Sequence, residues 1–599
     1  MRMIHETKQK HLYFSVAFAL SIALAPTSAY AVGNPVGSLE ASMPQAVQQN
    51  GNHKVTGRVV DSAGEPLIGA TIMVEGTKEG AVTDIDGNFT INTTSKAKLV
   101  ISYVGYTTQT ILVGDKTTID VTLKEVANTM NEVVVTALGI KRAEKALSYN
   151  VQSVGSNELT RNKDANFVNS LNGKVAGVNI SKSASGVGGA TRVIMRGAKS
   201  IEGDNNVLYV IDGIPIFNFS GGRDSGIMGE GRVSSEGIAD LNPEDIESIS
   251  VLAGPSAAAL YGSNAANGAI LITTKKGKEG RVDISFSSSA DFSSPLLMPE
   301  FQNTYGNKLG SYESWGEKLA TPSSYDPKKD FFRTGTNFIN ALTLNMGNEF
   351  NQTFASVATT NSRGIVPNNT YDRYNFTIRN TTRMFKNKVQ LDLGASYIKQ
   401  KDNNMVSQGE YWNPIVAAYL FPRGESFEGI KTFERYDNVR NFPTQYWPIS
   451  DSRFANQNPY WTAYRNLAPD DKDRFMFNAG LTYNIFDWLS VAGRIRLDKT
   501  FITSERKIYA SSFNYFAKEK GAYEYYDYKD HQTYIDAIAN INKTFGKFSL
   551  AANVGYSYSD YASLTRGYGG NLVLVPNKFS LNNINPSDSK IREGGGDSK

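Results

Sequence analysis

The chain has 599 residues, a formal net charge of +4 and no cysteine. The lack of cysteine excludes disulfides, thiol catalysis and thiolate metal sites, and the nearly balanced charge gives no evidence of the clustered basic face that binds nucleic acid. The many glycines (53), tyrosines (31) and phenylalanines (30) favour β-structure with tight turns and aromatic belts at a membrane surface.

Residues 1–31 have the pattern of a secretory signal peptide. Basic residues (Arg2, Lys8 and Lys10) precede an apolar run over 12–25, and Ala29-Tyr30-Ala31 supplies a small-x-small cleavage site. A membrane-anchoring helix is the alternative, but the run is too short to cross a hydrocarbon core of ~30 Å. We therefore expect export from the cytoplasm, with a polar linker over 32–53. A membrane role would then depend on β-strands.

Residues 54–125 are predicted to form a small β-sandwich. Alternating segments are followed by an Asp-Gly sequence at 84–89, which predicts a hairpin turn. The spacing of Asp84, Asp86 and Asn88 also suggests calcium, but the further oxygen ligands and flanking helices of an EF-hand are missing. A turn is therefore the better interpretation.

Three phrases in this segment connect it to a known family: Gly57-Arg58-Val59 through Gly69-Ala70, Asp84 to Phe89, and Ser102-Tyr103-Val104-Gly105-Tyr106. Together they resemble the carboxypeptidase-regulatory-like domain that precedes many SusC-type channels. The family name does not imply peptidase activity.

The segment 126–148 contains three consecutive valines with polar flanks, followed by Gly139-Ile140-Lys141-Arg142. Such a run favours an extended conformation, and inside a domain it would be an ordinary buried strand. Between two candidate domains it suits pairing with another protein by β-augmentation. It resembles the TonB box of SusC-type transporters. The resemblance implies that the C-terminal domain of TonB binds Glu132, Val133, Val134, Val135, Thr136 and Ala137.

Residues 149–278 are predicted to be a mixed α/β domain. Short helices are expected at 165–171, from 243 (with Asn242 as the N-cap) and from 255, with strands at 178–180, 191–197, 207–211, 248–252 and 269–274. The glycine-rich run at 251–262 lacks the Gly-Lys-Ser/Thr ending of a phosphate loop, which disfavours nucleotide binding.

Several phrases of this domain match, in order, the plug of SusC/RagA channels, namely 195–197, 208–215, 241–252 and 257–276. The chain is similar to that family over nearly all of its length from residue 50. The resemblance implies a plug motif made of Arg196, Gly197, Tyr209, Asp212, Gly213, Pro215, Tyr261 and Gly262.

Residues 279–599 contain alternating segments of about ten residues, the pattern of transmembrane β-strands. These segments lie at 282–288, 341–346, 374–379, 389–397, 475–483, 489–497 and 548–558. A large soluble β-protein would alternate in the same way, but the export signal, the aromatic content and the preceding plug favour a membrane barrel. The expected fold class is therefore mainly β, with a small N-terminal β-sandwich, a mixed α/β plug and a transmembrane antiparallel β-barrel that is incomplete in this chain.

Long insertions between these segments carry aromatic clusters, from which four candidates for substrate contact stand out: Trp412, Trp447, Tyr460 and Trp461. Their faces could stack on a sugar ring or a peptide side chain. Packing at the barrel rim or against a partner is an equally good interpretation.

The length of this region fits only part of a barrel. The related channels have 22 strands, and 279–599 has room for about half of that number at ~9–11 residues each. The polar ending from Arg592 to Lys599 is expected to be flexible rather than a closing strand. We therefore expect a truncated product or a partial sequence of a longer transporter.

The resemblance implies TonB-dependent import of oligosaccharides or peptides across the outer membrane, with a SusD-like surface lipoprotein as partner and the N-terminal domains in the periplasm. Contacts with outer-membrane lipid are expected, and nucleic acid is not. No catalytic residue, metal or cofactor is expected, since the exported part has only His53 and His531 as histidines. A TonB-linked substrate-sensing receptor and a non-transporting truncated product are the alternatives, while an adhesin would have no use for a plug.

Overall fold

The computed structural model describes residues 53–599 except 62–63, 78, 104–105, 124–132, 136–140, 144–150, 202–204, 217, 219–234, 452–455, 515–516, 547, 588–589 and 599. The predicted signal peptide and nearly all of the predicted linker lie outside the described residues. The chain divides into two compact units, Met1–Thr129 and Met130–Lys599. No helix among the described residues is long and apolar enough to cross a bilayer.

The first unit is a β-sandwich, as predicted. One sheet has the strand order β4-β1-β7 and the other β3-β2-β5-β6. Alternate residues of each strand point into the space between the sheets, where buried side chains from both sheets form one core. The strands are β1 (His53–Val60), β2 (Thr71–Val74), β3 (Gly80–Val82), β4 (Asn88–Thr93), β5 (Lys98–Ser102), β6 (Gln109–Leu112) and β7 (Val121–Thr122).

The Asp-Gly sequence of this unit forms a tight turn, but the predicted hairpin is wrong. The Asp84 carboxylate accepts hydrogen bonds from the backbone N–H groups of Asp86 (3.0 Å) and Asn88 (2.8 Å). The flanking strands β3 and β4 belong to different sheets, so the turn connects the two layers. Within the described ranges, no group of three or more His, Cys, Asp or Glu side chains is placed to hold a metal ion.

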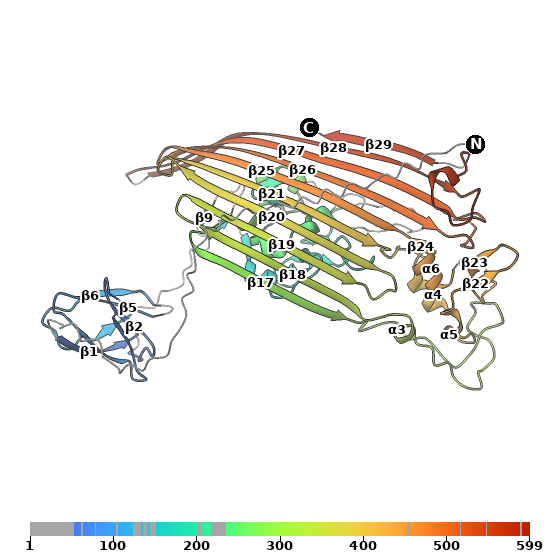
Figure 1. Cartoon of the computed structure of the whole chain (residues 1–599), viewed down its shortest axis with the longest axis horizontal. Helices are drawn as coiled ribbons and strands as arrows, with labels where there is room; N and C mark the ends of the chain where they lie inside the picture. Colours follow the sequence, from blue (N-terminus) through green and yellow to red (C-terminus); the bar gives the residue numbers. More distant parts are fainter. Residues whose placement is uncertain are drawn as a thin grey trace, which may run out of the picture. The chain divides into compact units, whose positions relative to one another are not determined.

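The second unit begins with a small mixed domain that lies on the inner face of a much larger sheet (Figure 1). Its five-stranded sheet has the order β10-β15-β16-β13-β14, and β11 and β12 form a separate pair. The strands are β10 (Val151–Gly155), β11 (Val178–Ser181), β12 (Arg192–Met195), β13 (Leu208–Ile211), β14 (Ile214–Pro215), β15 (Ile246–Leu252) and β16 (Ala269–Thr274).

The helices of this domain are short and several are 3-10 helices. They are α1 (Ser156–Thr160), η3 (Phe167–Leu171), η4 (Gly237–Asp240), η5 (Pro243–Asp245), α2 (Gly254–Tyr261) and η6 (Ser263–Ala265). Asn242 caps η5 as predicted, because its side-chain oxygen accepts a hydrogen bond from the N–H of Glu244 (3.1 Å) and Pro243 takes the first helical position.

The large sheet has eleven strands and is antiparallel throughout. Ten of its strands pair in the order β17-β18-β19-β20-β21-β25-β26-β27-β28-β29, and the short β24 (Asn466–Leu467) also pairs with β26. The ten strands are β17 (Gly280–Ser293), β18 (Gly335–Gly347), β19 (Asn351–Arg363), β20 (Thr370–Met384), β21 (Val389–Asn403), β25 (Pro469–Phe486), β26 (Leu489–Ile508), β27 (Ala522–Phe545), β28 (Phe548–Asn571) and β29 (Lys590–Ser598).

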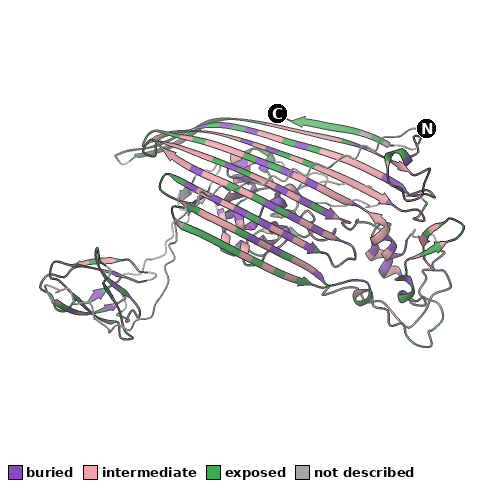
Figure 2. Ribbon diagram, in the orientation of Figure 1, coloured by how far each residue is buried: buried purple, intermediate pink, exposed green. Residues whose placement is uncertain are grey.

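The inner face of this sheet is buried beneath the mixed domain. Figure 2 shows buried residues gathered in the middle of the central strands, while β29 is exposed. In β19 alternate residues are buried, and most of these buried residues are small or polar. Among the described residues of the large sheet, only Ile398 and Met476 join the apolar core of the mixed domain. The contact between domain and sheet is therefore largely polar.

Two sequence-based expectations for this sheet are wrong. The strands are longer than the ten-residue segments, with 24 residues each in β27 and β28. In addition, the polar ending, expected to be flexible, forms β29, which pairs with β28 from Gly569↔Lys590 to Tyr561↔Ser598. The edge of β28 offers backbone donors and acceptors, and a glycine-rich segment can pair with them regardless of its side chains. The polar composition of residues 592–599 therefore did not predict their strand.

The two ends of the large sheet differ. At one end neighbouring strands are joined by tight turns, and at the other by long insertions that contain most of the remaining elements. These are α3 (Pro327–Asp330), α4 (Pro414–Leu420), α5 (Phe427–Ile430), β22 (Glu434–Asp437), β23 (Phe442–Gln445), α6 (Pro459–Arg465) and η7 (Leu581–Asn583). Aromatic side chains form a core of their own within these insertions.

Candidate functional site

The contact between the mixed domain and the sheet is concentrated at a two-residue turn. Asp212 (φ 51°) and Gly213 (φ 81°) connect β13 to β14, and the pairing Ile211↔Ile214 closes the hairpin. Positive φ at both central residues is the geometry of a type I′ turn, for which Asp-Gly is a preferred sequence. The turn brings the Asp212 side chain to the wall of the sheet.

Asp212 links three segments of the chain. Its carboxylate accepts hydrogen bonds from the N–H (3.0 Å) and the hydroxyl (2.8 Å) of Thr274, and it lies 3.0 Å from Nη1 of Arg379 on β20. Its backbone oxygen accepts a hydrogen bond from Arg494 on β26 (3.1 Å). Burial acts to raise the pKa of Asp212, but Arg379 and Thr274 outweigh burial and hold the pKa below its ordinary value.

A second contact is a buried ionic cluster around Asp240, at the end of η4. Its carboxylate lies 2.5 Å from Nζ of Lys472 and 2.8 Å from Nη1 of Arg474, and Arg474 in turn pairs with Asp498 (2.6 Å). The Asp240 side chain is only 1% exposed. Asn375 also donates a hydrogen bond to the Asp240 backbone oxygen (2.6 Å). The sequence analysis did not find this cluster.

The segments that carry Asp240 are held together by Glu236. Its carboxylate accepts hydrogen bonds from Asn166 (2.8 Å), from the N–H of Thr191 (2.9 Å) and from Asn218 (2.8 Å). Burial raises the pKa of Glu236 despite these three donors. Nearby, the guanidinium of Arg373 on β20 donates to the backbone oxygens of Ala165 (3.0 Å) and Ala239. Wall cations thus bind backbone oxygens as well as carboxylates.

Three other predicted plug residues have structural places within the plug itself. Arg196 (φ 56°) and Gly197 (φ 85°) form the corner after β12, and Tyr209 is buried in the domain core. Tyr261 ends α2, where Gly262 donates its N–H to the carbonyl of Ala258 (2.8 Å), and Tyr261 interacts electrostatically with Arg494 of the wall. The Pro215 oxygen also reaches the wall, where it accepts a hydrogen bond from Gln532 (3.1 Å).

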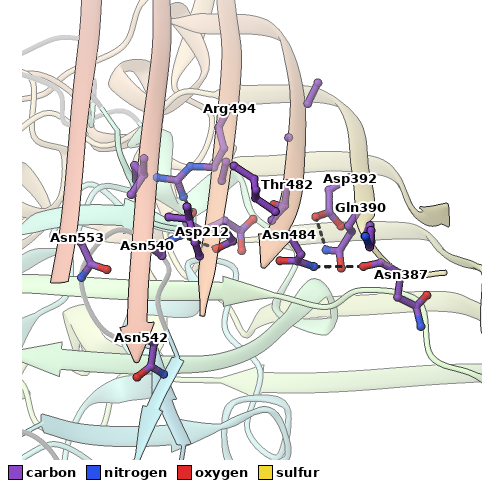
Figure 3. A pocket seen from close by; sticks show the side chains of 18 of the residues that line it. Asp212, Asn387, Gln390, Asp392, Thr482, Asn484, Arg494, Asn540, Asn542 and Asn553 are labelled. Atoms are coloured by element: carbon purple, nitrogen blue, oxygen red, sulfur yellow. Dashed lines mark hydrogen bonds between the residues drawn. The ribbon is translucent and has the colours of Figure 1, made fainter. Parts of the chain in front are cut away.

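A cavity of about 1270 Å³ lies beside the Asp212 turn, at the end of the sheet that has the tight turns (Figure 3). Its plug side is formed by Ile211, Asp212 and Ile214, and its other walls by the inner faces of β20, β21 and β25–β28. A smaller cavity of about 40 Å³, lined by Asp212, Asp245 and Arg496 among others, lies at the same interface. Both cavities have polar and apolar side chains in their walls, so the plug does not pack against the sheet without gaps here.

The predicted TonB-binding residues are only partly covered by the described residues. Glu132, Thr136 and Ala137 lie outside them. Val133, Val134 and Val135 form the strand β8 (Val133–Val135), which pairs antiparallel with β9 (Lys141–Ala143), with Val134 opposite Arg142. The predicted extended conformation is therefore present at the three valines.

The four aromatic candidates lie within the packed insertions. Trp412 (2% exposed) packs with Ile508, and Trp461 (1% exposed) donates its indole N–H to Ser512 (3.0 Å). Trp447 donates to the hydroxyl of Tyr312 (3.1 Å), and the Tyr460 hydroxyl donates to the carbonyl of Asp330 (3.2 Å). Trp412 and Trp461 are therefore buried within the insertions, and contact of any of the four aromatic residues with a substrate stays a prediction.

Comparison with known proteins agrees with this architecture. Residues 55–135 match the family of CarboxypepD_reg-like domains, and residues 143–269 match the TonB-dependent receptor plug domain. The chain is 32% identical over 417 residues to the TonB-dependent receptor SusC of Bacteroides thetaiotaomicron, an alignment that covers 68% of this chain and 39% of SusC. It is 30% identical over 385 residues to the TonB-dependent receptor P26 of Formosa agariphila, covering 62% of this chain and 37% of P26.

Among solved structures, the RagAB peptide importer in its open-open state matches with a TM-score of 0.59 at 19% identity, over 78% of this chain and 53% of that chain. This likeness concerns the fold. The chain spans 39% of SusC and about half of the matched RagAB chain. Both of these curated relatives are TonB-dependent receptors. In its sequence, its plug domain and its large antiparallel sheet, the chain resembles the SusC/RagA type of TonB-dependent receptor.

Proposed function

We propose that the chain acts in TonB-dependent import of oligosaccharides or peptides across the outer membrane, together with a SusD-like surface lipoprotein. The observation that supports this most directly is the way the plug is held. Ionic pairs and hydrogen bonds to backbone oxygens join it to the wall, and cavities lie between these contacts. Polar contacts of this kind can be exchanged for water, whereas a dry apolar interface would have to be exposed when the plug moves.

In this proposal the TonB box (Glu132–Ala137) lies in the periplasm, N-terminal to the plug, and pairs with the C-terminal domain of TonB. The box precedes β10, which is an edge strand of the plug sheet and pairs with β15 alone. A pull on the box would therefore reach the plug through an edge strand, where a single ladder of backbone hydrogen bonds must break. We propose four segments for the exported chain: the β-sandwich at 54–125, the TonB-box segment at 126–148, the plug at 149–278 and the barrel sheet at 279–599.

The test is the substitution Val134→Pro in the protein as its native cells produce it. Proline removes one backbone donor from the strand, so we expect TonB-dependent uptake to be lost while binding of the substrate at the cell surface is retained. Val134→Ile keeps the strand and its donor and should import like the wild type. Normal uptake by Val134→Pro would show that this segment does not couple the plug to TonB.

A TonB-linked sensing receptor is the competing function. Such receptors carry an additional α/β signalling domain before the box, whereas the first unit of this chain is an all-β sandwich. Import is therefore the function that the architecture favours.

A further inference from the structure

Three basic side chains lie together on the outer face of the large sheet, the face turned away from the plug. Lys499 on β26 is directly opposite His531 on β27, and the next outward pair along the same strands is Phe501 opposite Lys529. We call Lys499, Lys529 and His531 the basic cluster. All three are exposed, and at about 5 Å between opposite residues and about 7 Å between residues two apart on a strand, one small ligand group can reach all of them.

The basic cluster lies where the apolar part of the outer face ends. From Ile541, near the tight turn, to His531, β27 rises about 33 Å, or roughly 25 Å along the membrane normal at a tilt of ~40°. This equals the height of the apolar band of an outer-membrane wall, so the cluster is placed at the level of the lipid headgroups. The outward residues between these levels are mostly apolar, among them Val491, Ile495, Leu497, Ile535, Ala537 and Ala539.

The two lysines of the cluster have no acidic partner in the part of the chain that the structure describes. The ammonium groups of Lys499 and Lys529 form no ion pair and no hydrogen bond with any described residue. Lys399, on the same face of β21, provides the contrast, because it is paired with Asp471 and with Asp473 (2.8 Å). The positive charge of the cluster is therefore available to a ligand.

The acidic side chains closest to the lysines are held by other residues. Asp473 on β25 accepts a hydrogen bond from the Tyr397 hydroxyl (2.6 Å) in addition to its pair with Lys399. Asp527, two residues from Lys529, accepts a hydrogen bond from the hydroxyl of Thr503 (2.9 Å). Neither carboxylate forms an ion pair with the cluster.

The arrangement within the cluster is unfavourable unless an anion is present. Basic groups that face each other across a sheet repel, and Lys499 faces His531 directly and Lys529 diagonally. His531 interacts electrostatically with Asp530, whose side chain is buried on the inner face, and Asp560 lies on the membrane side of the cluster. A phosphate between the three basic groups would remove the repulsion and accept charge-assisted hydrogen bonds from them.

We propose that the basic cluster binds the phosphate of an anionic lipid headgroup, while the acyl chains of that lipid cover the adjoining apolar surface. That surface includes Leu497 and Ile535 (44% exposed), which follow the cluster on its membrane side. A lipid satisfies the charges and the apolar residues together, whereas free phosphate would satisfy the charges alone. This inference rests on the outer-membrane placement in the proposed function and is independent of import itself.

The experiment measures lipid binding by the protein extracted from the outer membrane of its native cells into a neutral detergent. Native mass spectrometry compares phosphatidylglycerol with phosphatidylcholine of the same acyl chains. We expect the wild type to prefer phosphatidylglycerol and Lys499→Gln/Lys529→Gln to lose roughly 30-fold of this preference, since two basic residues at a lipid surface are removed. Lys499→Arg/Lys529→Arg keeps both charges and should keep the preference. Lys399→Gln/Lys401→Gln, at lysines already paired with Asp471, should bind like the wild type.

Three results would overturn the proposal: equal binding of the two lipids by the wild type, an unchanged preference in the glutamine pair, or binding of inorganic phosphate as tight as that of phosphatidylglycerol. Melting temperatures in detergent alone establish that each variant is folded. If the glutamine pair does not reach the outer membrane, the single change Lys499→Gln should lower the preference about fivefold. Val134→Pro should bind both lipids like the wild type even though its uptake is lost, so a failure of the import function would not alter this result.

Discussion

The turn at Asp212 offers the sharpest test of how the plug is seated. Asp212→Asn keeps the size of the side chain and suits the positive φ of the turn, since asparagine also tolerates that region. The asparagine oxygen can still accept from Thr274, so the main loss is the charge opposite Arg379. The Asp212 side chain is 27% exposed and the Arg379 side chain 11% exposed. Removing one partner of a fully buried ion pair costs about 3–5 kcal/mol, and an ion pair on the surface contributes below ~1 kcal/mol, so the cost here should lie between these values. We expect a cost of about 2 kcal/mol.

This cost should appear as local opening rather than global unfolding. A change of about 2 kcal/mol raises the open population of the hairpin roughly 30-fold. Hydrogen exchange of peptides covering β13, β14 and the end of β16 should accelerate by that factor, while peptides from β27 and β28 stay unchanged. The double variant Asp212→Asn/Arg379→Gln removes both charges and should cost less than the sum of the single changes. Additive single costs, or unchanged exchange around Asp212, would refute the ionic account of the seat.

Two further predictions concern the same interface. The depressed pKa of Asp212 means that its contribution is fully present above the unfolded value of ~3.9 and is lost as pH falls through the lower folded value. The difference in hydrogen exchange between wild type and Asp212→Asn should therefore shrink progressively as the pH is lowered below about 4, and a difference that does not shrink on acidification would contradict this. Arg474→Met leaves Asp240 and Asp498 without their shared cation, and we expect calorimetric unfolding to show a loss of stability of about 3–5 kcal/mol. The control Lys399→Met removes a partly exposed ion pair on the outer face and should cost below ~1 kcal/mol. Equal costs for the two variants would argue against the buried cluster.

Local sequence signals predicted most of the plug. The Asp-Gly turn, the Asn242 cap and the strand at 269–274 follow from contacts between neighbours in the chain, and each is present. The ionic cluster at Asp240 could not be found in the same way, because its partners lie more than 230 positions away. The sequence did contain one signal, because Lys472, Arg474 and Asp498 occupy inward positions of their strands. Charged side chains at inward positions indicate that the inner face of the sheet contacts polar groups of another domain.

The strands of the large sheet were predicted less well, for two different reasons. In β19 small polar residues occupy both faces, so no apolar alternation marks the strand. In β27 the outward residues change along the strand, from Ile541 and Ile535 near the tight turn to His531 and Asp527 near the insertions. A search for apolar alternation therefore detects at most the half of such a strand that lies near the tight turn.

The change from apolar to polar outward residues along β27 indicates how far the insertions lie from the lipid bilayer. A strand of 24 residues is about 79 Å long, or roughly 60 Å along the membrane normal at a tilt of ~40°, while the apolar band of an outer-membrane wall is ~25 Å tall. If the insertions face the outside of the cell, more than half of the length of β27 and β28 would stand beyond the bilayer, whereas β17–β21, with 13–15 residues each, would extend much less. The packed rim would then meet solutes above the lipid headgroups, where a long polymer can be engaged without being drawn against the charged surface of the cell.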